Sequence, residues 1–220
     1  MPAWLSQTRN LPSLEAEVCF QIQDRFYYGP DRVSDPSDYE RLAEKLAPPA
    51  IASIAPSMVR SAEALGHEAE LAAYYRQIVR LARHHQRPFN AIRHYFWLRL
   101  WLWNSQEQAH ISFPWYDSYA EIDRVLKALV ETESGPVHDD ADQGWEVQIH
   151  AQDDAVYLLQ RDPDEDEDEA QTALCVPRAE LVGQVARLRE RTQGIIARLS
   201  GELGADVWTS YIRTEPTFAS

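Results

Sequence analysis

The sequence predicts an α+β fold in which helices pack on an antiparallel sheet. Two patterns carry this prediction. Several short segments alternate apolar and polar residues, which is typical of half-buried strands. Longer segments repeat apolar residues every three or four positions, which is typical of amphipathic helices. Near the C-terminus three alternating segments precede one long helical segment, so we expect a three-stranded acidic meander followed by a long helix.

The N-terminal half is expected to contain one strand and three helices. Alternation over residues 15–28 predicts the strand. Asp35 is the expected N-cap of the first helix. Apolar spacing predicts a second helix over residues 49–65, with a kink or restart at Pro56, and a third over residues 67–86.

Residues 94–103, with the sequence HYFWLRLWLW, fit either a helix or a strand. A helix would be apolar on all sides. A strand would have one aliphatic face and one face of aromatic residues around Arg99, so we favour a strand. A shorter strand over residues 109–114 should pair with it, and Ser118 with Glu121 forms the capping box of a following helix.

The meander is expected from strands over residues 145–150, 156–159 and 172–176, with a turn at Asp153 and Asp154. The acidic run of residues 162–169 then connects the last two strands. A long helix should begin after Pro177 and end at Gly201 or Gly204. Its expected inward residues are Leu181, Val185, Leu188, Thr192, Ile195 and Leu199.

We expect residues 1–220 to form a single domain, with a candidate sub-boundary near residues 134–143. Neither a signal peptide at the N-terminus nor a run of about 18 apolar residues is present, which predicts a cytoplasmic protein without a membrane span. Cys19 and Cys175 both fall on predicted strands. We expect free thiols, and a bridge only if those two strands are neighbours.

The charge is concentrated in one part of the chain. The whole sequence has 35 acidic residues against 21 Lys and Arg, a net charge of −14. Residues 131–169 contain fifteen acids and one base, Arg161, so this window carries the entire net charge. Nucleic acids and anionic membranes are therefore not expected partners, whereas a protein with a basic surface is.

Catalytic and cofactor motifs are missing from the sequence. It contains neither a glycine-rich phosphate loop nor a G-x-S-x-G segment, so an enzyme is not expected. His84 and His85 are adjacent and would point about 100° apart on a helix, which disfavours a shared metal ion. The acidic run begins like a calcium loop but has Glu167 where the turn glycine belongs, so we expect weak divalent binding at most and no cofactor.

Two groups of residues are candidates for binding a partner protein. One is acidic and the other is the aromatic face of the predicted strand, where Trp, Tyr and Arg together are typical of interface hot spots. The alternatives are that the acids only solubilise the protein and that the tryptophans belong to the core. The candidates are Asp139, Asp140, Asp142, Asp162, Asp164, Glu165, Asp166, Glu167, Asp168, Glu169, Trp97, Arg99, Trp101 and Trp103.

The sequence resembles the immunity proteins of bacterial contact-delivered toxins in four features. These are the Tyr-Tyr-Gly-Pro turn at residues 27–30, the acidity, the aromatic patches and the α+β layout. The resemblance is to the type VI secretion class, TsiT-like antagonists of effectors with a restriction-endonuclease-like nuclease domain. It implies a stoichiometric inhibitor that binds and neutralises a cognate toxin. The alternative is an adaptor or chaperone that docks a secreted effector. The aromatic face and the apolar spacing of the last helix also predict a homodimer.

Overall fold

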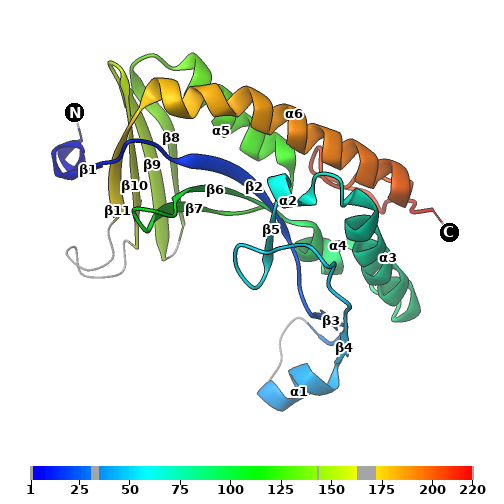
Figure 1. Cartoon of the computed structure of the whole chain (residues 1–220). Coiled ribbons are helices and arrows are strands. Elements are labelled where there is room, and N and C mark those ends of the chain that lie inside the picture. Colours follow the sequence, from blue (N-terminus) through cyan, green and yellow to red (C-terminus); the bar gives the residue numbers. More distant parts are fainter. Residues whose placement is uncertain (1, 31–34, 143, 163–171, 220) are drawn as a thin grey trace. The chain divides into compact units, whose positions relative to one another are not determined.

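The computed structural model describes residues 2–30, 35–142, 144–162 and 172–219, and it confirms the α+β class (Figure 1). The chain divides into two compact units. Unit 1 comprises residues 1–18, 99–115 and 120–190, and unit 2 comprises residues 19–98, 116–119 and 191–220. Residues 134–143, where the sequence suggested a sub-boundary, lie inside unit 1.

Unit 1 contains a five-stranded sheet with the order β1-β11-β10-β9-β8. Its strands are β1 (Arg9–Asn10), β8 (Gly135–Asp142), β9 (Trp145–Gln152), β10 (Ala155–Arg161) and β11 (Thr172–Pro177). The antiparallel β9, β10 and β11 confirm the predicted meander, with Asp153 in the turn at a φ of 53°. The sequence analysis missed the two edge strands. β8 pairs antiparallel with β9, and β1 pairs parallel with β11.

The helices of unit 1 are α5 (Tyr119–Glu131) and the first half of α6 (Arg178–Leu203), both as predicted. They run side by side (Figure 1), and Arg189 of α6 donates from Nε to Oδ1 of Asp123 in α5 at 2.6 Å. The short 3-10 helix η1 (Ala3–Gln7) is fixed to the sheet because Trp4 Nε1 donates to the side-chain oxygen of Gln148 at 2.7 Å. The six expected inward residues of α6 are all buried.

A four-stranded sheet has the order β5-β2-β6-β7, and β2 and β6 each contain residues of both units. Its strands are β2 (Glu15–Gln21), β5 (Met58–Arg60), β6 (Leu98–Asn104) and β7 (Ala109–Tyr116). Residues 94–103 are therefore a strand only from Leu98 onward, because η2 (Arg93–Phe96) is a 3-10 helix. Within β6 the predicted faces are correct, since Leu98, Leu100 and Leu102 are fully buried and the alternate residues are half-buried.

Two predictions for the N-terminal half are wrong. The single strand over residues 15–28 is two strands, because the chain leaves β2 and forms β3 (Arg25–Tyr27) in a separate two-stranded sheet with β4 (Ala43–Lys45). The helix over residues 49–65 is reduced to α2 (Ser61–Ala64). Its first part contains Pro56, whose missing N–H disfavours a helix, and is followed by β5, which pairs with β2. The helix α1 (Pro36–Arg41) begins as predicted, with the Asp35 side chain accepting from Ser37 N at 2.8 Å.

Unit 2 has an aromatic core beneath α3 (Glu68–His84), the predicted third helix, and the short α4 (Phe89–Ile92). The Trp208 ring lies 5.0 Å from that of Tyr75 and 5.6 Å from that of Phe96. Trp208 belongs to the segment after α6, for which the sequence predicts neither a helix nor a strand. This segment is held down further along, where the Glu215 carboxylate accepts from Phe89 N at 3.0 Å.

The two cysteines lie on β2 and β11, in different sheets, and both are free thiols. Burial raises the pKa of the Cys175 thiol, which keeps it protonated at neutral pH. A bridge between them would require neighbouring strands, so the expectation of free thiols is confirmed. None of the helices in the described part of the chain combines the length and apolar character needed to cross a bilayer.

Trp208→Ala should lower the free energy of unfolding by about 3–5 kcal/mol, because the side chain is fully buried among other rings. Chemical denaturation followed by circular dichroism measures this loss. Leu65→Ala is the control, since Leu65 is 55% exposed and its truncation should change stability by only about 0.5 kcal/mol. Equal losses in the two variants would contradict the assignment of Trp208 to the core.

Candidate functional site

The acids closest to the predicted sub-boundary lie on the edge strand of the five-stranded sheet. Asp139, Asp140 and Asp142 belong to β8, which pairs only with β9 among the strands of the described residues. Asp139 is exposed and Asp140 is half-buried. An edge strand presents unpaired backbone groups, and charged residues on it discourage random pairing with other strands. The edge is therefore both accessible and negatively charged.

More negative charge gathers where β8 ends. The carboxylate of Asp162 lies beside Gly144, in the turn between β8 and β9. Its Oδ2 would be 3.8 Å from a Cβ atom added to that glycine. Asp142 is at the same turn, because it pairs with Trp145 at the start of β9. The structure thus brings Asp142 and Asp162 to one end of the sheet. The other acidic candidates lie outside the described residues, in the connection between β10 and β11: Asp164, Glu165, Asp166, Glu167, Asp168 and Glu169.

The only base of the acidic window is already engaged. Arg161 donates from Nε to Oε2 of Glu146, and the partly exposed guanidinium covers a carboxylate that is itself buried. Gln148 also donates to Glu146, to its Oε1 at 2.7 Å. Arg161 therefore compensates a carboxylate on the sheet face rather than the acids of β8.

His138 lies on β8 between the buried sheet and the acidic edge. Burial lowers the pKa of this imidazole, and the effect outweighs the carboxylates of Asp140 and Asp139, which favour the charged form. The His138 ring lies 5.7 Å from that of Phe113, on the buried side of β7. Next to the acidic edge, His138 is thus a half-buried imidazole whose neutral form is favoured.

The outward side of β6 and β7 carries the second group of candidates. The Trp101 ring stacks on that of His110 at 5.0 Å, and the guanidinium of Arg99 lies 4.5 Å from the centre of the Trp115 ring. These four residues and Trp103 are called here the β6–β7 aromatic face; four of the five are half-buried and His110 is exposed. The Trp101 Nε1 hydrogen has no acceptor among the described residues. That nitrogen is itself buried, so only the half-burial of the side chains leaves part of this face exposed.

Trp97 is separate from that face. It precedes β6, belongs to unit 2, and donates from Nε1 to Oδ1 of Asp117. Its ring lies 6.2 Å from that of His94. Its indole N–H is thus satisfied within unit 2, so Trp97 has a local structural role there.

The sequence analysis missed a cluster that joins two distant parts of unit 2. Potential ligand atoms of Glu44, His84 and His85 all lie within 4.8 Å of one another. The expectation that the two histidines diverge is wrong. His84 ends α3, and His85 is its C-cap with a ψ of 9°, so helical spacing does not apply to the second residue. No local signal could have revealed Glu44, which comes from β4.

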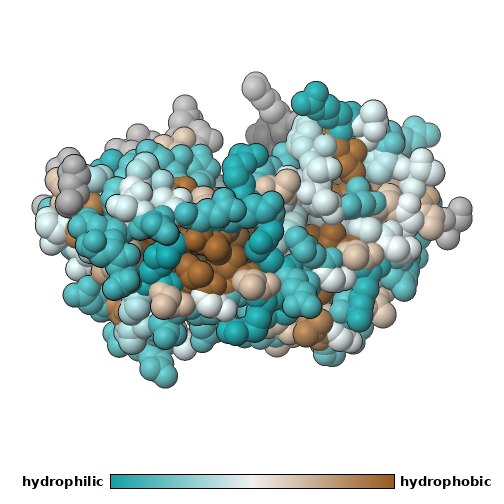
Figure 2. Space-filling view, turned by 90° about the horizontal axis from the view of Figure 1, so that it is seen from above, coloured by the Kyte–Doolittle hydropathy of each residue, from teal (hydrophilic) through white to brown (hydrophobic). Residues whose placement is uncertain are grey.

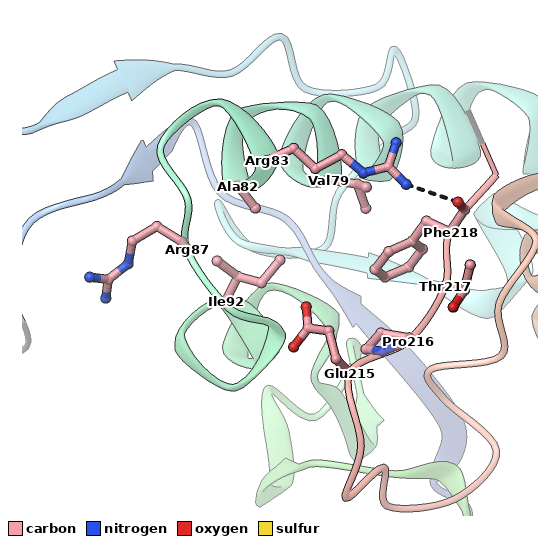
Figure 3. Close-up of a pocket in the computed structure, with 9 residues that line it drawn as sticks. All are labelled: Val79, Ala82, Arg83, Arg87, Ile92, Glu215, Pro216, Thr217 and Phe218. Atoms are coloured by element: carbon pink, nitrogen blue, oxygen red, sulfur yellow. Dashed lines mark hydrogen bonds between the residues drawn. The ribbon is translucent and has the colours of Figure 1, made fainter.

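A cavity of about 290 Å³ lies between α3, α4 and the C-terminal segment (Figure 3). Arg83 donates from Nη2 to the carbonyl of Phe218 at 2.8 Å, and the Arg87 guanidinium points away from the other lining residues. Glu215 already accepts from the backbone of Phe89. Arg83 and Glu215 therefore hold the C-terminal segment against α3 and α4.

No family model, curated protein or solved structure matches the chain.

Trp101→Ala should cost about 1–2 kcal/mol of stability, because it removes a ring stack and a half-buried apolar side chain. Leu100→Ala, at the fully buried neighbouring position, should cost about 2–5 kcal/mol. Urea unfolding of both variants makes the comparison. If Trp101→Ala is as destabilising as Leu100→Ala, Trp101 belongs to the core and not to a binding surface.

The lowered pKa of His138 predicts that acid destabilises the fold. The unfolded chain takes up a proton on this residue near the ordinary value of about 6.5, whereas the folded chain takes it up at lower pH. The free energy of unfolding therefore falls as the pH falls through this range. Urea unfolding at several pH values should show a flatter dependence in His138→Gln and a steeper one in Asp140→Asn. An unchanged pH dependence in His138→Gln would contradict the neutral, buried state.

Proposed function

We propose that this protein is an immunity protein, a stoichiometric inhibitor that binds and neutralises a secreted antibacterial toxin. The observation that carries the proposal is the placement of the net charge. Fifteen acids and one base occupy residues 131–169. Several of the acids that the structure describes lie on the accessible edge strand β8 and at the adjoining end of its sheet. Such a one-signed surface favours association with a partner of opposite charge.

A nuclease is the toxin class that suits this surface best. Its active-site cleft must attract phosphates and is therefore basic. An acidic edge and sheet end can steer toward that cleft and cover it, so that nucleic acid is excluded. The inhibitor would act in the cytoplasm, where such a toxin reaches its substrate. It would need neither catalysis nor a cofactor, and it would bind neither nucleic acid nor membrane.

The β6–β7 aromatic face supplies the apolar contact that charge alone does not provide. Steering mainly raises association rates, whereas slow dissociation depends on a few desolvated anchors, often Trp and Arg. Trp101 and Trp103 are half-buried and belong to the same unit as the acids of β8. We infer that this face contacts the toxin.

Self-association remains a prediction, but of the two surfaces that suggested it only the β6–β7 aromatic face is still available. The apolar stripe of α6 is buried within the chain, so it offers no face to a second copy. On the side of α6, Figure 2 shows mainly hydrophilic residues, with an apolar patch near the middle. A homodimer would therefore use the β6–β7 aromatic face, in competition with the toxin.

Co-expression tests the function directly. Candidate toxins are nuclease effectors encoded beside this gene, each produced in a bacterial host with and without this protein. An immunity protein restores growth against one toxin and forms a stable complex with it. Restored delivery without restored growth would indicate an adaptor or chaperone instead, and failure against every neighbouring toxin would overturn the proposal.

Neutralising the edge should slow association with that toxin. Asp139→Asn with Asp140→Asn should reduce the association rate by about 2- to 10-fold and flatten its dependence on salt, with little change in dissociation. Surface plasmon resonance at several salt concentrations measures both rates. The matched control is Glu15→Gln with Glu190→Gln, which removes two exposed acids elsewhere in unit 1. Equal rates in the two double variants would mean that the acids of β8 only solubilise the protein.

A further inference from the structure

Three side chains of unit 2 form the strongest unexplained cluster outside the acidic surface. Oε1 of Glu44 and Nε2 of His85 lie 2.5 Å apart, within hydrogen-bonding distance. The His84 ring lies 4.7 Å from the His85 ring, centre to centre, in an edge-to-face arrangement. A simple Glu–His pair would account for the first contact. It does not account for a second imidazole whose ligand atom lies within 4.8 Å of both partners.

We propose that Glu44, His84 and His85 bind a divalent transition-metal ion, with Zn²⁺ as the best fit. Two imidazoles and one carboxylate are a common ligand set for zinc, and softer sulfur ligands are not required. A fourth position would remain open to water. The proposal is independent of the toxin-binding role, because this cluster lies in unit 2 and the acidic strand β8 lies in unit 1.

The strands β3 and β4 prepare one side of the site. Glu44 pairs directly with Phe26 in the antiparallel ladder, so both side chains project from the same face. Tyr28, two residues beyond Phe26, stacks on the His85 ring with the centres 3.9 Å apart and the planes 1° from parallel. Phe26 stacks on His85 at 6.2 Å. These two rings fix the plane of the His85 imidazole, which a metal ligand requires.

The C-terminal end of α3 prepares the other side. His84 is its last residue and His85 its C-cap, where the aligned peptide dipoles place partial negative charge. A cation is therefore favoured at this end of the helix even before it meets its ligands. The His85 backbone N–H donates to the Leu81 carbonyl at 2.9 Å, which holds the histidine in place.

The spacing of the ligand atoms suits a small ion after a short adjustment. Bonds of about 2.0–2.1 Å in tetrahedral geometry separate two ligand atoms by about 3.4 Å. The atoms now lie between 2.5 Å and 4.8 Å apart, on either side of that value. The Glu44 side chain is 43% exposed and His84 is exposed, so both can rotate without disturbing the core. Binding would replace the hydrogen bond between Glu44 and His85.

Isothermal titration of the untagged full chain with zinc chloride tests the proposal. Excess Mg²⁺ in the buffer occupies the exposed carboxylates, because carboxylates suit hard cations. It leaves imidazole sites available for zinc. We expect one saturable site and a rise in melting temperature on zinc addition, since the ion binds only the folded arrangement. Absence of a saturable site would overturn the proposal.

Two variants and one control assign the site. His84→Ala and Glu44→Gln should each weaken zinc binding by about 100-fold or more, because even groups that merely support a ligand contribute about 10- to 100-fold. The control is His67→Ala, at the other end of α3. His67 also contacts a carboxylate, with Nδ1 2.9 Å from Oε1 of Glu70. Its substitution by alanine should leave the zinc affinity unchanged.

The variants remain informative even if one is unstable. His84 is exposed, so His84→Ala should melt like the wild type in the absence of zinc. Wild-type affinity in folded His84→Ala would assign the zinc to other residues and overturn the proposal. Loss of affinity in His67→Ala equal to that in His84→Ala would do the same.

Discussion

Burial of one stripe along α6 is the constraint on which both units depend. The helix contains Gly183 and Gly194, each of which weakens it by about 1 kcal/mol relative to alanine, so packing must hold it. Its first half lies in unit 1 and its second half in unit 2. In each half the residues that face inward are fully enclosed. The stripe consists of Leu181, Val185, Leu188, Thr192, Ile195 and Leu199.

The same burial determines where charge can be placed. On β9 and β10 the inward positions are apolar, as at Ile149 and Leu158, because a carboxylate there would lose its hydration without compensation. Among the described residues of the acidic window, the carboxylate that is buried belongs to Glu146, and it has Arg161 as a partner. The described acids of β8 and the adjoining turn therefore remain at the edge and the end of the sheet. The charge on which the proposed toxin binding rests is therefore located outside the core.

Aromatic residues fall into two physical classes in this protein. Trp208 and Tyr75 are enclosed in unit 2 and stabilise its core by burial. Trp101 and Trp115 stack on a histidine and an arginine at a partly exposed surface, where a partner could remove more area from water. Composition does not distinguish the two classes, because both use the same residue types. Burial does, and it leaves the β6–β7 aromatic face as the one proposed to contact a partner.

The sequence by itself determined the elements whose burial pattern repeats along the chain. The apolar period fixed α3 and α6, and alternation fixed the meander and the two faces of β6, since each side chain's direction follows from local geometry. Only the tertiary structure decided which strands pair at the edges, why residues 49–65 are mostly not helical, and how Glu44 meets His84 and His85. Those outcomes depend on contacts between residues far apart in the chain. Local periodicity carries no information about such contacts, because it records which side of an element is buried and not what lies against it.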